Sequence, residues 1–106
     1  MSKRIINKMT GDYHAWLIKS LRNKKEAELY LDAALDEYQN DNNVEALLVA
    51  LRNVAEAQGG IGKLSSVTQL NRETLYRTLS KKGNPKLQTL GLILGGLGFH
   101  LSIKAA

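Results

Sequence analysis

The chain contains 106 residues, carries a formal net charge of +5 at pH 7 and has no cysteine. A chain of this length suits one domain with room for a short appendage, and it can bury a modest core without covalent cross-links. The lack of cysteine excludes disulfide bonds, thiolate nucleophiles and thiolate metal ligands.

Two segments bear on where the protein resides. Residues 1–14 are basic, but the apolar run of a signal peptide does not follow them. The apolar stretch of residues 87–103 has no charged residue, yet it includes polar residues such as Gln88 and His100. It is also shorter than the roughly 20 residues that cross a bilayer. We therefore expect a cytoplasmic protein with no membrane span.

The net charge hides three blocks of alternating sign. Residues 1–25 hold seven basic residues and one acid, residues 26–58 hold one base and eight acids, and residues 59–106 hold seven bases and one acid. A basic C-terminal half favours a polyanionic partner, because neutralised phosphates release their counterions. The acidic middle block would repel DNA, so we expect it to face away from any nucleic acid.

The first half of the chain predicts three amphipathic helices. We expect a short helix over residues 12–23 and a second over 24–38, where Asn23 is the N-cap and Glu26 the third helical residue. Residues 39–43 form a polar break. A third helix starts after the N-cap Asn43 and ends at the glycine pair 59–60. The second and third show apolar residues at a period of 3.6.

The second half predicts three shorter helices. The fourth covers residues 61–68, and the fifth covers 72–80 behind the N-cap Asn71. The sixth covers residues 86–96, and Pro85 can open it at the first helical position. Its glycines each weaken a helix by about 1 kcal/mol relative to alanine, so packing must stabilise it.

After Gly98 the apolar period changes from 3.6 to 2. Phe99, Leu101 and Ile103 alternate with polar residues, which predicts a short C-terminal strand. A single strand leaves its backbone groups unpaired, and the same strand of a second copy would satisfy them across a two-fold axis. We therefore predict a homodimer. The alternative is an irregular tail.

The fifth segment has the pattern of a helix that reads DNA. Leu75 and Leu79 fall on one side, and the side facing solvent carries Arg72, Glu73, Thr74, Tyr76 and Arg77. In a major groove, Arg can pair with guanine, Glu can accept from cytosine and Thr can contact a thymine methyl group. An ordinary solvated helix of an all-α bundle would show the same pattern.

Flanking residues are candidates for contacts with the DNA backbone. Lysines meet phosphates without reading sequence, and those nearest the two helices are Lys63, Lys81 and Lys82. Gly60 and Gly62 would let the amides at the start of the fourth helix approach a phosphate.

Several segments together resemble a known family, the addiction-module antidote proteins of the Cro/repressor-like helix-turn-helix superfamily. The resemblance covers residues 18 to 103. The segments that carry it are Tyr30–Glu37 (YLDAALDE), Ala50–Ala55 (ALRNVA), Glu56–Leu64 (EAQGGIGKL), Leu70–Arg77 (LNRETLYR) and Gly83–Pro85 (GNP).

The resemblance implies a fold and a function. Such proteins are antitoxins of type II toxin–antitoxin pairs, often of phage origin. They neutralise a small basic toxin of the RelE/ParE superfamily and repress their own operon as dimers. The implied fold is an all-α, five- to six-helix Cro/repressor-like domain over residues 43–106, preceded by a helical extension over 1–42 for the toxin or another partner. The family pattern at the start of the recognition helix matches Leu70–Arg77.

Two residues depart from the family pattern. Gln69 stands where the turn of a helix-turn-helix unit usually has glycine, and a non-glycine residue in a left-handed turn costs about 1 kcal/mol. Ser65 stands where the first helix of the pair usually has alanine, and it still fits. Neither change forbids the fold.

The antitoxin interpretation gives the acidic block a partner. Opposite charge would steer a basic toxin toward this surface and cover the toxin's cationic residues. Alternatively, these acids only solvate the outer side of the second helix. The candidate toxin-binding residues are Glu26, Glu28, Asp32, Asp36, Glu37 and Asp41.

We predict no enzyme, no cofactor and no metal site. His14 and His100 are isolated in sequence, and the chain has no metal-ligand spacing, phosphate-binding glycine loop or nucleophile motif. Trp16 and the tyrosines follow helical spacing that is typical of core or interface residues. Two alternatives to an antitoxin remain: a prophage-type repressor without a toxin partner, and a protein-binding inhibitor that does not bind DNA.

Overall fold

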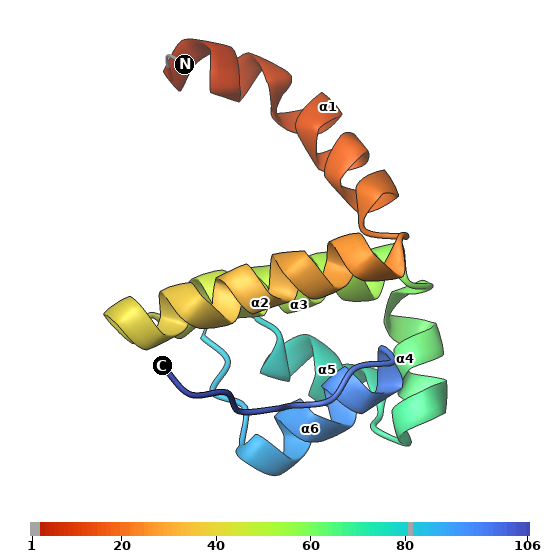
Figure 1. Ribbon diagram of the computed structural model, residues 1–106. Coiled ribbons are helices and arrows are strands. Elements are labelled where there is room, and N and C mark those ends of the chain that lie inside the picture. Colours follow the sequence, from red (N-terminus) through yellow and green to blue (C-terminus); the bar gives the residue numbers. More distant parts are fainter. Residues whose placement is uncertain (1–2, 81) are drawn as a thin grey trace.

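The computed structural model describes residues 3–80 and 82–106, with side chains from Gly11 onward. Within these ranges the chain forms six helices and no strand, which confirms the predicted all-α class (Figure 1). The helices are α1 (Lys3–Ser20), α2 (Lys24–Asp41), α3 (Val44–Ala57), α4 (Gly60–Thr68), α5 (Arg72–Thr78) and α6 (Leu87–Gly96).

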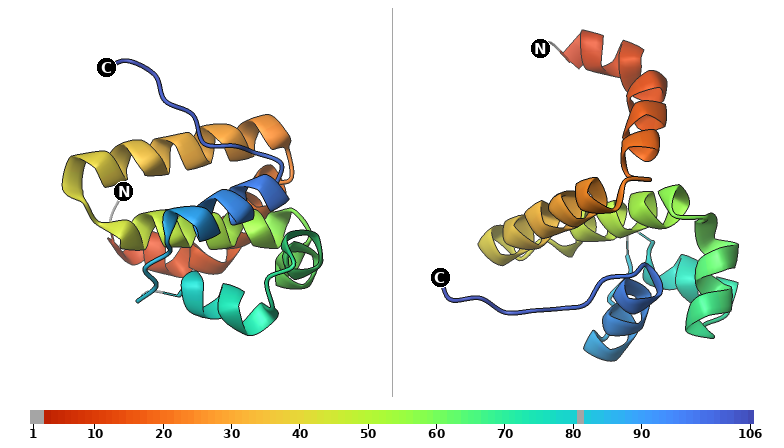
Figure 2. Two further views of the ribbon diagram at one scale, coloured as in Figure 1. Left: turned by 90° about the horizontal axis from the view of Figure 1, so that it is seen from below. Right: turned by 45° about the vertical axis from the view of Figure 1, so that its right-hand side comes forward.

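Helix α3 lies at the centre of the molecule. It runs antiparallel to α2 along its length, while the shorter helices α4, α5 and α6 lie together on one side of this hairpin (Figures 1 and 2). Leu48 and Val54 of α3 are completely buried, as are Leu75 of α5 and Ile93 of α6. One continuous core therefore joins α2 to α6.

Three asparagines begin helices as predicted. The side-chain oxygen of Asn23 accepts the backbone N–H of Glu26 at 3.0 Å, and that of Asn43 accepts the N–H of Glu45 at 3.0 Å. Asn71 caps α5 by accepting the N–H of Thr74 at 2.7 Å. These bonds satisfy backbone donors that have no partner inside the first turn of a helix.

Several helix boundaries differ from the prediction. Helix α1 begins at Lys3 rather than near residue 12. Helix α2 continues through the expected polar break to Asp41, where its polar last residues are exposed. Asn42 then ends the helix in a left-handed conformation with φ 57°, and Asn43 is already the N-cap of α3. Helix α5 ends at Thr78. Pro85 precedes Lys86, the N-cap of α6, so it does not occupy the first helical position.

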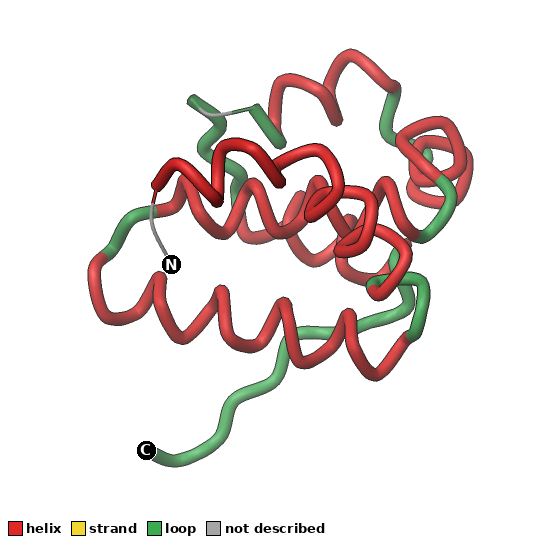
Figure 3. Tube along the Cα trace, turned by 90° about the horizontal axis from the view of Figure 1, so that it is seen from above, coloured by secondary structure: helices red, strands yellow, loops and turns green. Residues whose placement is uncertain are grey.

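The predicted C-terminal strand is not found. Residues 99–106 form an extended tail that has no ladder partner in the described part of the chain (Figure 3). The tail is held at its start: the amino group of Lys24 donates to the carbonyl of Leu97 at 2.6 Å and lies 4.9 Å from the centre of the Phe99 ring. Beyond this point Ile103 is fully exposed. The homodimer prediction therefore loses the strand as its basis.

The end of α6 explains why the chain changes direction before the tail. Gly98 adopts φ 89°, and the N–H of Phe99 reaches back to the carbonyl of Leu94 at 2.8 Å. This is the left-handed glycine cap of a helix C-terminus. None of the helices in the described ranges has the length and apolar character needed to cross a membrane.

Substitution of two glycines of α6 by alanine should change the stability of the protein in opposite directions. Gly91→Ala should stabilise the protein by about 1 kcal/mol, because nothing lies within 4 Å of the added methyl group and alanine favours the helix. Gly96→Ala should destabilise it by about 1–3 kcal/mol, because the methyl group would lie 2.6 Å from Thr68 Cγ2 and 2.9 Å from Leu64 Cδ1. Chemical denaturation of both variants measures this. A gain in stability at Gly96 would contradict the close packing of α6 on α4.

Candidate functional site

Helix α5 presents a polar side to solvent and an apolar side to the core. Leu75 and Leu79 are 0% and 1% exposed, whereas Tyr76 is 62% exposed. Arg72, Glu73 and Arg77 are also exposed, and Thr74 is half-buried. The structure therefore places Arg72, Glu73, Tyr76 and Arg77 on the exposed side of α5, with Thr74 at the margin of that side.

A short turn orients α5 relative to α4. Gln69 adopts the left-handed conformation, with φ 67° and ψ 8°. The hydroxyl of Ser65 donates to the carbonyl of Leu70 at 2.6 Å, and Thr68 Oγ1 accepts the N–H of Leu70 at 3.2 Å. From the sequence, Ser65 was expected only to fit where the family usually has alanine, and no hydrogen bond to Thr68 was expected. These bonds lock the turn although its left-handed residue is not glycine.

Arg72 lies against the first half of α4. A Cβ atom built on Gly62 would be 2.9 Å from Nη2 of Arg72 and 3.3 Å from its Cζ. The absence of a side chain at residue 62 therefore leaves the space in which the guanidinium group rests. The sequence predicted a different purpose for Gly62, which was to let a phosphate approach the backbone amides of α4.

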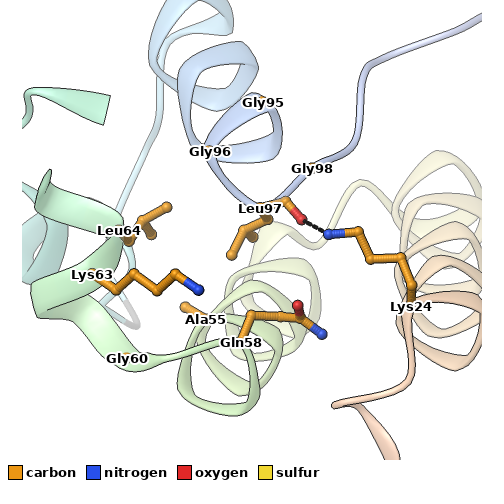
Figure 4. A pocket seen from close by; sticks show the side chains of 10 residues that line it. All are labelled: Lys24, Ala55, Gln58, Gly60, Lys63, Leu64, Gly95, Gly96, Leu97 and Gly98. Atoms are coloured by element: carbon orange, nitrogen blue, oxygen red, sulfur yellow. Dashed lines mark hydrogen bonds between the residues drawn. The ribbon is translucent and has the colours of Figure 1, made fainter. Parts of the chain in front are cut away.

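The candidate lysines occupy different places. Lys82 is exposed in the loop after α5, and Lys81 lies outside the described residues. The side chain of Lys63 points toward a hollow of about 150 Å³ between α3, α4 and α6 (Figure 4). On the far side of this hollow, Lys24 donates to the carbonyl of Leu97. The Lys63 side chain nevertheless remains exposed to solvent.

The acidic candidates are all exposed on α2, but they do not form one patch. Glu26, Glu37 and Asp41 recur at helical spacing on one side of the helix, and the other three candidates lie on another side. On that second side, Asp32 lies 3.9 Å from the amino group of Lys104 in the tail.

One acid of the second side has a perturbed pKa. The side-chain hydrogen bond from Lys25 at 2.8 Å, and then its positive charge, lower the pKa of the Glu28 carboxyl group, and the same pair raises the pKa of Lys25. The two groups are fully exposed, so this ion pair says little about stability or function.

A broad groove between α2 and α3 was not foreseen from the sequence. Its volume is about 730 Å³. The acidic side chains Glu37 and Glu45 lie among its lining residues, and most of the rest are small and apolar. The lining residues are Tyr30, Ala33, Ala34, Glu37, Asn43, Glu45, Ala46, Val49 and Ala50. No local sequence signal marks this groove, because it depends on how two helices pair.

The aromatic residues of α1 are not part of the core. Tyr13 is 59% exposed and Trp16 is 61% exposed, and their rings are 5.8 Å apart. The two histidines lie apart: His14 Nε2 is 3.2 Å from a carboxylate oxygen of Glu56, and His100 is exposed in the tail. Among the described residues, no three His, Asp or Glu side chains are grouped so that they could hold a metal ion.

Comparison with known proteins gives a family. A family model described as "probable addiction module antidote protein" matches residues 15–105. An uncharacterized protein of Haemophilus influenzae (strain ATCC 51907 / DSM 11121 / KW20 / Rd) is 30% identical over 84 residues, which cover 79% of this chain and 81% of that protein. No solved structure matches the chain.

The left-handed residue of the α4–α5 turn leads to a stability prediction. Gln69→Gly should raise the free energy of unfolding by up to about 1 kcal/mol, because glycine relieves the left-handed strain and loses part of that gain through a freer unfolded chain. Gln69→Val, with its branched Cβ, should lower it. Urea unfolding of the three proteins checks the order. Equal stability of all three would show that residue 69 is not left-handed in solution.

Proposed function

The chain belongs to the family of probable addiction module antidote proteins, and we propose on this premise that it is a DNA-binding antitoxin of a type II toxin–antitoxin module. In this proposal it neutralises a small basic RelE/ParE-like toxin and represses its own operon as a homodimer. One observation supports the DNA-binding part most directly: α5 buries its leucines and exposes Arg72, Glu73, Tyr76 and Arg77 together.

The α4–α5 pair acts as a Cro/repressor-like helix-turn-helix unit in this proposal. Helix α5 lies in the major groove, and α4 crosses the sugar-phosphate backbone. Arg72 and Arg77 donate to guanine or to phosphate, Glu73 accepts from the amino group of cytosine, and Thr74 contacts a thymine methyl group. Lys63, Lys81 and Lys82 meet phosphates, which position the protein without reading the sequence.

The charge pattern suggests that the toxin binds a different part of the chain from the DNA. Residues 59–106 carry seven bases and one acid, which suits DNA, and residues 26–58 carry eight acids and one base, which suits a cationic protein. Residues 43–106 then form the DNA-binding domain, and residues 1–42 contribute to toxin binding. The acids of α2 steer the toxin and lie away from the operator.

Replacement of the two arginines tests operator binding. Arg72→Ala and Arg77→Ala should each weaken binding to DNA from the upstream region of the gene by about 1–3 kcal/mol, provided that each contacts a base. Fluorescence anisotropy at fixed salt measures the affinity. Lys104→Ala is the control, because it removes one positive charge beside Asp32 and far along the chain from α5. Unchanged affinity in both arginine variants would remove them from the site.

Co-expression tests toxin binding. We expect the antitoxin to co-purify with the product of an adjacent small, basic reading frame, and to restore growth of cells that express this product. Reversing the charge of Glu37 and Asp41 should slow association, because opposite charges steer the encounter. Operator binding without any co-purifying toxin supports a repressor that has no toxin partner. Toxin binding without operator binding supports a pure inhibitor.

A further inference from the structure

Among the side chains that the structure describes, helix α1 carries two large aromatic residues that the chain itself leaves largely uncovered. Tyr13 and Trp16 are more than half exposed. They are three residues apart, which places them on the same side of the helix. Large aromatic side chains of this kind are the usual anchors of protein–protein contacts.

Contacts at the C-terminal end of α1 turn Tyr13 and Trp16 away from the rest of the same chain. Ile18 and Leu21 are buried at 9% and 2% exposure, and His14 lies 3.2 Å from Glu56 of α3. Trp16 and Ile18 are two residues apart, so they point to nearly opposite sides of the helix. The chain therefore cannot cover Trp16 with its own groove unless it gives up the burial of Ile18. Figure 1 and the right-hand view of Figure 2 show α1 extending away from the hairpin of α2 and α3.

The groove between α2 and α3 has the complementary character. Its small side chains, among them Ala33, Ala46 and Val49, leave room for large ones from a docking helix. Glu37 and Glu45 supply negative charge beside them. Helices α2 and α3 together contain eight acids and three bases, whereas α1 contains four bases and one acid. An amphipathic basic helix fits this surface, and the chain itself carries one.

We propose that α1 of one copy docks its Tyr13 and Trp16 side into the α2–α3 groove of a second copy, and that the second copy does the same in return. Because the exchange is reciprocal about a two-fold axis, it closes at two chains. This contact deepens the proposed homodimer by giving it a surface in place of the missing strand. No residue of α5 lines the groove, so the exchange leaves Arg72 and Arg77 free for DNA.

The fluorescence of Trp16 gives a direct test, because it is the only tryptophan of the chain. As the full-length protein is concentrated from submicromolar to high micromolar levels, its emission should shift to shorter wavelength. Analytical ultracentrifugation should show the mass rising over the same range from 11.7 kDa to twice that value. The two transitions should have the same midpoint.

Two matched pairs of substitutions test the charged part of the contact. Glu37→Gln with Glu45→Gln should raise the dimer dissociation constant about tenfold, because each charge is lost twice in a symmetric dimer. Glu28→Gln with Asp36→Asn removes the same charge from exposed residues of α2 outside the groove, and it should leave the constant unchanged. Added salt should weaken the unsubstituted dimer more than the groove variant.

The aromatic anchor is tested by Trp16→Ala, which should raise the dissociation constant by at least about a hundredfold. The side chain is 61% exposed, so the helical circular dichroism and thermal transition of the monomer should persist. Tyr13→Ala should also weaken the dimer while keeping the fluorescent probe.

Three outcomes would overturn the proposal. A blue-shifted Trp16 emission from protein that sediments as a monomer would show α1 closing on its own chain. A dimer with solvent-exposed Trp16 emission would place the contact elsewhere, and a monomer at every concentration would remove the contact. Operator binding and toxin binding are measured separately, by the arginine variants and by co-purification of the unsubstituted protein, so failure of this contact is distinguishable from failure of the proposed function.

Discussion

The burial of α3 between α2 and the three short helices determines how everything else in the molecule is oriented. Its completely buried side chains belong to one continuous core with leucines of α5 and Ile93 of α6, and truncating such a side chain to alanine costs about 2–5 kcal/mol. Helix α5 has only seven residues and could not hold a fixed orientation alone. Burial of Leu75 and Leu79 in this core fixes the rotation of α5 about its axis. Arg72, Tyr76 and Arg77 therefore face the solvent. The same packing energy thus folds the chain and selects the exposed surface.

Features that depend only on residues close together in the sequence could be predicted from it. An asparagine before an amphipathic run is a helix cap because its side chain reaches the amide two or three residues later, and Asn23, Asn43 and Asn71 all do so. The period of 3.6 also gave the inward side of α5. The family resemblance stated from the sequence is confirmed by a match over residues 15–105.

The features that the sequence did not predict depend on contacts between distant residues. Phe99, Leu101 and Ile103 alternate as in a strand, but Lys24, 75 residues before Phe99, holds the start of the tail and no ladder partner follows. The groove likewise exists only because α2 and α3 lie side by side. Arg72 rests beside Gly62 because the turn at Gln69 brings two helices together. No periodicity encodes such relations, since each requires the fold to be known first.

The three charge blocks acquire a physical meaning once the helices are placed. Like charges within one block would repel each other across a compact surface, so each block is best satisfied by a partner of opposite sign. In the proposed function, the basic C-terminal block binds DNA. The acidic block has two candidate cationic partners, a toxin and the basic α1 of a second copy, and Glu37 lies where both would bind. If α1 and the toxin compete for this groove, then toxin binding must dissociate the dimer, and by thermodynamic reciprocity dimerisation on the operator must weaken toxin binding to the same extent. The acidic groove would then couple neutralisation of the toxin to release of the operator through a single contact.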